Sequence, residues 1–180
     1  VAYAAAAQAA GLILSTQAST RLEAVSHAYL AEPDHGPLWM QLYLQADRGA
    51  TLALVQRAET AGYEALVVTV DAPTHGARDR ERRAQFQMPA GMQVNLDTPP
   101  LRANADVDAG WQTVLAHAPT WSDIAWLQTQ TRLPILLKGI THPADAKQAL
   151  ACGVAVRPGH ALEHLAVARG GAGVCAAAQL

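Results

Sequence analysis

A hydroxyl, a carboxylate and a guanidinium lie close together in this sequence, after a run of apolar, β-branched residues. The run Ala65-Leu-Val-Val-Thr-Val-Asp71 predicts a buried parallel strand that ends with Thr69 and Asp71. Because side chains alternate between the faces of a strand, these two lie on the same face. A proline and a glycine then predict a loop that returns Arg78 to the strand end. Such strand ends carry the chemistry of α/β barrels.

A Thr-x-Asp pair by itself is also typical of a turn after a strand, but the chain repeats this design three times. Polar side chains close the predicted strands 12–15, 38–43 and 134–138: Ser15, Gln41, Tyr43 and Lys138. Core packing alone does not explain polar groups at the same end of four strands. The sequence therefore predicts a functional site at the carboxyl ends of a parallel sheet.

Helical segments alternate with these strands, as βα units require. The alanine-rich segment 1–10 predicts the end of a helix with Gly11 just after it. Apolar residues spaced by three and four positions predict two further helices. One starts near residue 22, and the other, marked by residues 52–58, ends at Gly62. Thr120 with Asp123 predicts the cap of another helix, and Thr141 the cap of a helix over 143–151 stopped by Gly153. This order favours a barrel or a doubly wound parallel sheet.

Residues 72–119 form a long connection with five prolines and little periodicity. Loops of this length inside a domain are typical of functional lids or of disorder. Within it, the cluster 78–83 interleaves both signs of charge and predicts a solvated helical turn.

Composition excludes several classes of protein. The 180 residues are 51% hydrophobic and 16% charged, with a net charge of −2, which suits one core and gives no electrostatic case for nucleic acid. No apolar run approaches the roughly 20 residues that span a bilayer, and the amino terminus lacks the basic region of a signal peptide. We therefore expect a cytoplasmic protein whose Cys152 and Cys175 are reduced. The histidines and cysteines predict no metal site.

Six segments carry a family resemblance, in order and at near-family spacing over roughly residues 8 to 153. They are Leu14-Ser-Thr-Gln-Ala-Ser19, Gln41-Leu-Tyr43, Arg57-Ala-Glu-Thr-Ala-Gly62, Thr69-Val-Asp-Ala-Pro73 with Gly76-x-Arg78, Trp121-Ser-Asp-Ile-Ala-Trp126 and Leu133-Pro-Ile-Leu-Leu-Lys-Gly139. Together they resemble the FMN-dependent α-hydroxy acid oxidase/dehydrogenase family, which includes glycolate oxidase, lactate oxidase, L-lactate dehydrogenase and mandelate dehydrogenase.

The resemblance implies a TIM (β/α)8 barrel, here an incomplete barrel with about four βα units, that holds FMN at the carboxyl ends of its strands. It implies a flavoprotein oxidoreductase that oxidises an (S)-2-hydroxy acid to a 2-oxo acid, in a family that is often homo-oligomeric. The residues that match the family's flavin contacts are Ser15, Gln41, Thr69 and Lys138. Tyr43 matches a tyrosine that contacts the substrate, Arg78 the arginine that binds its carboxylate, and Asp71 the acid that orients the catalytic histidine.

The resemblance stops after Gly153. The family has a strand ending in S-N-H-G-G-R, whose histidine is the base, whereas here the family spacing places that position on Leu162, between His160 and His164. Pro158 is expected, with the glycine after it, to prevent the strand. The sequence thus predicts the central part of the flavoenzyme domain over 1–153 and a divergent tail over 154–180. We expect such a chain alone to be inactive and to hold FMN weakly.

Two alternatives stay open. One is another barrel that binds a phosphorylated ligand and uses Lys138 to form a Schiff base. The other is a non-catalytic remnant, or a partly folded half-barrel, which would expose two strand edges and an apolar inner face.

Overall fold

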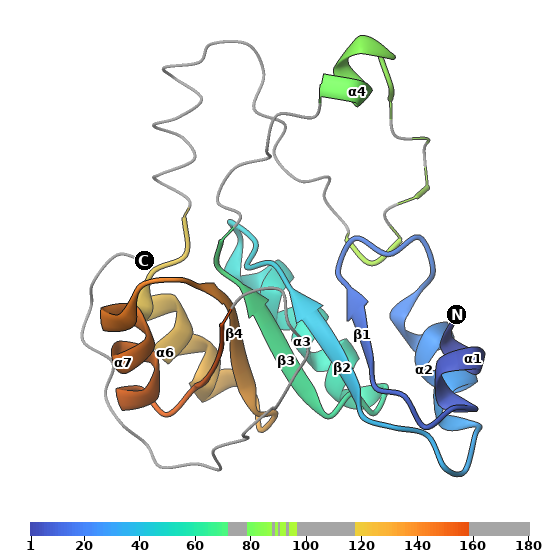
Figure 1. The fold of residues 1–180 in the computed structure, drawn as a ribbon, viewed down its shortest axis with the longest axis horizontal. Helices are drawn as coiled ribbons and strands as arrows, with labels where there is room; N and C mark the ends of the chain where they lie inside the picture. Colours follow the sequence, from blue (N-terminus) through green and yellow to red (C-terminus); the bar gives the residue numbers. More distant parts are fainter. Residues whose placement is uncertain (72–78, 88, 90, 93, 97–117, 159–180) are drawn as a thin grey trace.

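A curved parallel sheet organises the computed structural model, which describes residues 1–71, 79–87, 89, 91–92, 94–96 and 118–158 (Figure 1). Its strands are β1 (Leu12–Ser15), β2 (Leu38–Leu42), β3 (Ala65–Thr69), β4 (Ile135–Ile140) and β5 (Ala155–Pro158). They pair in the order β1-β2-β3-β4-β5, so each strand lies beside the one that follows it in sequence. This sequential parallel order is the order of a barrel wall.

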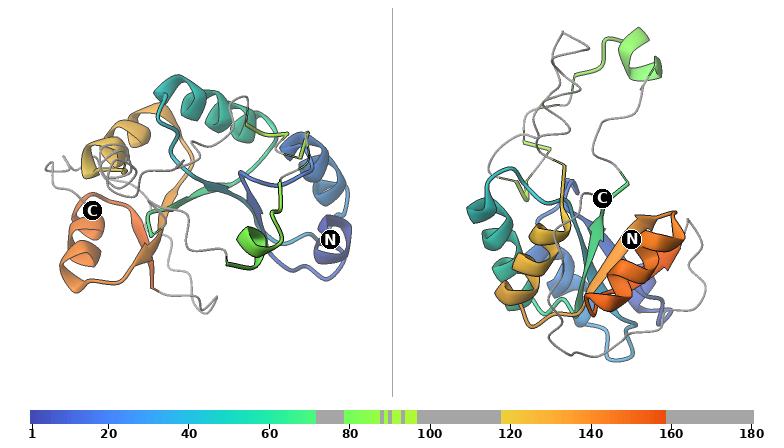
Figure 2. Two further views of the ribbon diagram at one scale, coloured as in Figure 1. Left: turned by 90° about the horizontal axis from the view of Figure 1, so that it is seen from above. Right: turned by 90° about the vertical axis from the view of Figure 1, so that its left-hand side faces the viewer.

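A helix follows each of the first four strands and packs on the outside of the curve (Figure 2). These helices are α2 (Leu22–Leu30), α3 (Arg48–Thr60), α6 (Trp121–Gln130) and α7 (Pro143–Ala151). Two short helices, α1 (Ala2–Ala6) and α4 (Asp79–Arg83), complete the described set. The expected incomplete barrel with four βα units is confirmed, and a fifth strand is added to it.

The strand β5 corrects the sequence prediction. Pro158 was expected to prevent a strand, but it lies in register with Ile140 of β4. Because β5 is the last strand of this sheet, a proline there removes no hydrogen bond to a further described strand. The register between β4 and β5 shifts between Lys138 and Ile140, which marks a local bulge at the end of β4.

The predicted helix ends are confirmed for two helices. Gly62 follows α3 and has a φ of +87°, a left-handed conformation that suits glycine at a helix end. At the start of α6, the Asp123 carboxylate accepts from the Thr120 N–H at 3.0 Å and from its hydroxyl at 2.8 Å. This contact is the acidic half of a capping box.

Two other helix ends differ from the prediction. The cap of α7 is His142, whose Nδ1 accepts from the Ala144 N–H at 3.2 Å, because Pro143 takes the first helical position and leaves Thr141 one residue too early. The helix α1 ends at Ala6 rather than beside Gly11, and Ala9 has the left-handed φ of +52°.

Alternation along the strands gives the sheet two different faces. The outer face packs on the helices through large aliphatic side chains, which share one core with the helix residues; its members on β2, β3 and β4 include Leu38, Met40, Leu42, Leu66, Val68 and Leu137. The inner face carries a smaller cluster of Ala65, Val67 and Leu136, packed against the partly buried Ile13 and Trp39. Val67 is 2% and Leu136 1% exposed, so the expected exposure of the apolar inner face is wrong for this cluster.

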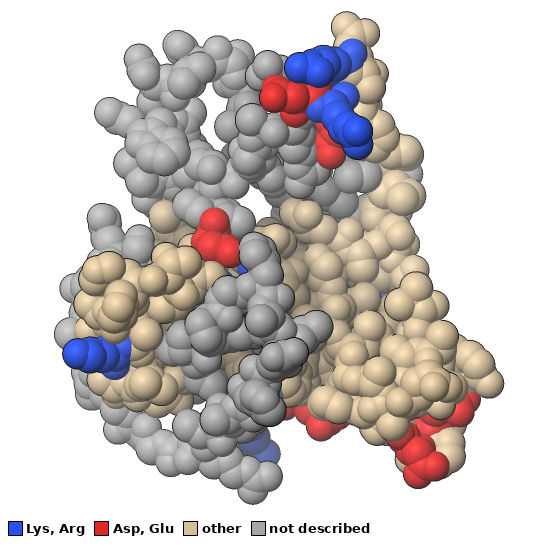
Figure 3. Space-filling view, viewed as in Figure 1, with Lys and Arg blue, Asp and Glu red and all other residues tan. Residues whose placement is uncertain are grey.

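The remaining predictions concern charges, cysteines and membrane spans. α4 confirms the helical turn in the charge cluster, and Figure 3 shows its acidic and basic side chains side by side at one end of the molecule. Cys152 is buried and Cys175 lies outside the described residues, so their expected reduced state stays a prediction. Among the described helices, none is long and apolar enough to cross a membrane.

Candidate active site

The carboxyl ends of four adjacent strands bring the predicted flavin contacts into neighbouring positions. Ser15 of β1 is in register with Gln41 of β2, and Thr69 of β3 is in register with Lys138 of β4. Each is separated by two positions from an inner-face residue, so all four belong to the inner face. The structure therefore gathers polar groups where the inner face ends.

Gln41 and Thr69 form a buried hydrogen-bonded pair at the centre of this site. The Gln41 amide Nε2 donates to the Thr69 hydroxyl oxygen at 3.0 Å, and the two residues are 9% and 5% exposed. The Gln41 Oε1 accepts from the Thr16 N–H at 3.3 Å, while the Thr16 hydroxyl donates to the Gln41 carbonyl oxygen at 2.6 Å. Thr16 thus fixes which end of the amide faces Thr69. Sequence reasoning missed this residue, because a threonine after a strand has no distinctive pattern.

Lys138 and Asp71 form an ion pair beside the Gln41–Thr69 pair. The Lys138 Nζ lies 3.1 Å and 3.2 Å from the two carboxylate oxygens of Asp71. Their side chains are 31% and 37% exposed, so solvent screens the attraction and its net contribution is at most about 1 kcal/mol. Asp71 thus lies next to a predicted flavin contact.

Gly139 allows this close approach between the ends of β3 and β4. Its φ is +107°, and a Cβ at this position would lie 2.4 Å from both the Cβ and the Cγ of Asp71. Any larger residue would displace the carboxylate. The sequence does contain a signal for this role, a glycine directly after the strand-end lysine, although its spatial neighbour could not be read from it.

The other predicted site residues are less closely engaged. Ser15 is exposed, and its hydroxyl oxygen accepts from the Gln17 N–H at 3.1 Å. Tyr43 is partly buried just after β2, and its carbonyl oxygen accepts from the Gln45 side chain at 2.7 Å. Arg78 lies outside the described residues, as do the three positions considered for the base, Leu162 and its flanking His160 and His164.

The described site can hold the polar edge of a heteroaromatic ring. An amide with a remaining N–H, a hydroxyl and an ammonium group lie at the carboxyl end of the sheet, and each of the three residues is held by a neighbour. These groups suit an electron-rich edge such as that of an isoalloxazine, which a positive charge stabilises when the ring becomes more negative. The donor set therefore fits FMN at the ring.

Two side chains with shifted pKa values lie where α2 meets the neighbouring elements. A hydrogen bond from Arg57, on α3, holds the pKa of Glu23 below its ordinary value. Burial raises the pKa of Tyr63, whose hydroxyl donates to the Leu22 carbonyl at 3.0 Å. Both contacts fasten α2 to the rest of the helical layer.

Comparison with known proteins agrees with this geometry. A sequence model of the FMN-dependent dehydrogenases matches residues 1–156. The chain is 43% identical over 163 residues to an L-lactate oxidase of Alicycliphilus denitrificans, covering 86% of this chain and 43% of that protein. It is 36% identical over 156 residues to the human 2-hydroxyacid oxidase 1, covering 80% of this chain and 40% of that protein.

Solved structures of mandelate oxidase share the fold. The structure with benzoyl-formic acid superimposes with a TM-score of 0.68 at 31% identity, covering 86% of this chain and 40% of the other. A variant with a C4a-OH-FMN adduct gives a TM-score of 0.66 with the same coverage. The chain spans less than half the length of the curated relatives it matches.

Proposed function

This chain belongs to the FMN-dependent dehydrogenase family, and from that premise we propose that it is part of a flavoenzyme that oxidises a small (S)-2-hydroxy acid to a 2-oxo acid. The observation that carries the proposal is the buried Gln41–Thr69 pair with Lys138 beside it, at the carboxyl ends of adjacent strands. Relatives named L-lactate oxidase, 2-hydroxyacid oxidase and glycolate oxidase support this substrate class.

Four residues of the proposal would hold the cofactor. Gln41 and Thr69 would hydrogen-bond the polar edge of the flavin ring, and Ser15 would contact it from β1. Lys138 would place a positive charge beside the ring, where negative charge develops. When bound, FMN supplies the acceptor for the two electrons of the substrate.

Three residues would serve the substrate. Tyr43 would donate a hydrogen bond to it, and Arg78 would bind its carboxylate with a planar pair of donors. Asp71 would orient the histidine that takes up the substrate proton and would stabilise the resulting imidazolium. Lys138 contacts a carboxylate, whereas a Schiff-base lysine must be a neutral amine, so the structure offers no support for the Schiff-base alternative.

Other expectations from the sequence remain proposals. We propose residues 1–153 as the central part of the flavoenzyme domain and 154–180 as a divergent tail. A cytoplasmic location and a homo-oligomeric state also stay predictions.

A chimaera tests the proposed function directly. Residues 1–156 replace the matching segment of the L-lactate oxidase relative, which then supplies the rest of the barrel. We expect a yellow protein whose flavin absorbance bleaches anaerobically on addition of L-lactate. Lys138→Met should slow this bleaching by about 10²–10³, the cost of removing one group that stabilises developing charge.

The matched control is Lys147→Met, which removes the exposed lysine of α7 and should leave the rate unchanged. A chimaera that folds and retains FMN but never bleaches with any 2-hydroxy acid would contradict the proposed function. Equal rates for both lysine variants would contradict the role of Lys138 but would leave the proposed function standing.

A further inference from the structure

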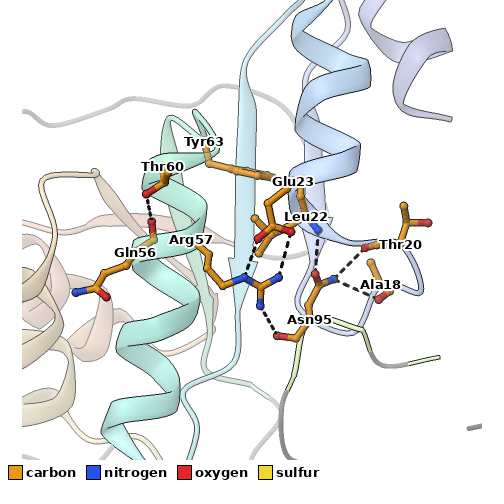
Figure 4. A network of polar contacts seen from close by, with 9 residues as sticks. All are labelled: Ala18, Thr20, Leu22, Glu23, Gln56, Arg57, Thr60, Tyr63 and Asn95. Carbon is orange, nitrogen blue, oxygen red and sulfur yellow. Dashed lines mark hydrogen bonds and ion pairs between the residues drawn. The ribbon is translucent and has the colours of Figure 1, made fainter. Parts of the chain in front are cut away.

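Asn95 is a buried polar residue that the site described above does not use (Figure 4). It belongs to the stretch between β3 and α6, yet it is only 1% exposed and its side chain reaches the connection between β1 and α2. Its Oδ1 accepts from the Leu22 N–H at 2.9 Å, and its Nδ2 donates to the carbonyl oxygens of Thr20 at 3.0 Å and Ala18 at 3.3 Å. One amide therefore binds three backbone groups.

The helix α2 takes its amino-terminal cap from this amide. Its own N-cap residue, Arg21, makes no side-chain capping bond, and Leu22 is the first residue of the helix. The first N–H groups of a helix lack an intrahelical acceptor, and asparagine is among the residues that best replace it. Here the cap comes from a residue 73 positions away in sequence.

Asn95 is held in turn by the helix α3. Its carbonyl oxygen accepts from an Arg57 Nη at 3.1 Å, and the same guanidinium donates to both carboxylate oxygens of Glu23 at 2.7 and 3.2 Å. Figure 4 shows Arg57 between Glu23 and Asn95, with α2 on one side and α3 on the other. The position of the Asn95 amide is thus fixed by two helices.

The connection that Asn95 binds leads to the candidate active site. Its first residue is Thr16, whose N–H and hydroxyl hold the Gln41 side-chain and backbone oxygens. The Ala18 N–H donates to the Ser15 carbonyl oxygen at 3.0 Å, which makes the connection a tight turn. Ala18 and Thr20 are thus joined through this turn to Thr16, whose N–H contacts the Gln41 amide oxygen.

We propose that Asn95 is a positioning residue for the candidate flavin site: it fixes the β1–α2 connection and, through Thr16, the orientation of the Gln41 amide. What this amide binds rests on the proposed function, but the positional link is a property of the protein alone. Asparagine is required because its side chain offers an acceptor to Leu22 together with donors to two carbonyl oxygens. Aspartate has the same shape but would set an oxygen against those carbonyls.

The test is NMR of the full chain with and without Asn95→Asp, in the absence of flavin. We expect the Leu22 amide to exchange with solvent about tenfold faster, the loss expected for one buried hydrogen bond. We also expect the Gln41 side-chain amide signals to shift, while the backbone signal of Leu136 stays in place. The control is Gln56→Glu, the same amide-to-carboxylate change on the exposed side of α3, which should alter neither signal.

Faster exchange at Leu22 with unchanged Gln41 signals would overturn the proposal, since Asn95 would then be a helix cap only. If Asn95→Asp does not fold, the wild-type chain decides. A protected Leu22 amide, with Overhauser contacts from the Asn95 amide protons to Thr20 and from the Gln41 amide protons to Thr69, would support the link. A freely exchanging Leu22 amide, or Gln41 amide protons without contacts to Thr69, would overturn it. Because no flavin is present, failure here is separate from failure of the chimaera.

Discussion

The two faces of the sheet are built from alternate residues of the same strands, yet the outer face forms the core and the inner face carries the polar site. On the outer face, Met40, Val68 and Leu137 are at most 1% exposed and pack on the helices. On the inner face, the residues next to them end the strands as Gln41, Thr69 and Lys138. The outer face is apolar along the whole length of the strands. The inner face is apolar in the first part of each strand and polar at the carboxyl end.

The difference shows how one sheet separates stability from chemistry. Apolar burial gains free energy without requiring precise partners, while buried polar groups cost free energy unless they are hydrogen-bonded. Within the described part of the chain, no buried side-chain polar atom lacks a hydrogen-bond partner. The inner face can therefore keep polar groups in place because each is fixed by a neighbour, as Thr16 fixes Gln41.

The largest expected loss of stability comes from a substitution in the core on the outer face. Leu137→Ala removes a fully buried side chain from the core and should lower the free energy of unfolding by about 2–5 kcal/mol. Leu150→Ala, on α7 and 61% exposed, is the control and should stay within about 0.5 kcal/mol. Urea denaturation measures both. Similar losses for the two variants would mean that the outer face is not the main core.

The next effect concerns the junction of the two strands at the site. Gly139→Ala combines a left-handed φ with a contact of 2.4 Å to Asp71, so we expect a loss above the roughly 1–2 kcal/mol of left-handed strain alone. Gly91→Ala is the matched control, because Gly91 has a φ of +81° but no atom within 4 Å of the added Cβ. Urea denaturation of both variants separates the cost of backbone strain from the cost of the steric clash with Asp71. Equal losses of unfolding free energy would mean that the clash with Asp71 does not matter.

A smaller effect is expected on the inner face. Gln41→Leu removes the partner of the Thr69 hydroxyl and the side-chain acceptor of the Thr16 N–H, which keeps only its bond to the backbone carbonyl of residue 41. This loss should cost about 1–3 kcal/mol of stability. In the chimaera the same change should also reduce FMN retained after desalting. Gln56→Leu on the exposed side of α3 provides the reference. Unchanged flavin content with reduced stability would make Gln41 a purely structural residue.

The smallest effect lies in the helical layer, away from both faces. The pKa of Glu23 is lowered by Arg57 in the folded state, so its contribution is present above the unfolded pKa and is lost as pH falls through the folded value. Because the Glu23 side chain is 46% exposed, we expect only about 0.2–1 kcal/mol at pH 7. The difference in stability between wild type and Glu23→Gln should shrink as the pH falls below the ordinary glutamate pKa of 4.5 and should vanish below the lowered folded pKa. A difference that persists there would point to packing instead of charge.

Much of this arrangement was predictable from local pattern. The strands 12–15 and 65–71 were predicted from apolar runs, and the structure ends the second at Thr69. Alternation alone assigns Val67 and Thr69 to one face. The Thr120–Asp123 cap and the glycine end of α3 follow from residue type and spacing. Each depends on atoms a few residues apart, so the sequence determines them directly.

Tertiary structure decided the rest, because it depends on contacts between distant residues. Nothing near Asn95 in the sequence shows that it caps a helix 73 positions earlier, and nothing near Gly139 shows that Asp71 comes within 2.4 Å of its missing Cβ. Pro158 joins β5 in register with Ile140, where no further described strand needs its missing N–H. The sequence by itself thus determined the first four strands, their faces and the family, and the packed chain decided how the polar groups are held. Hydrogen bonds at such separations form only after the sheet has brought their partners together.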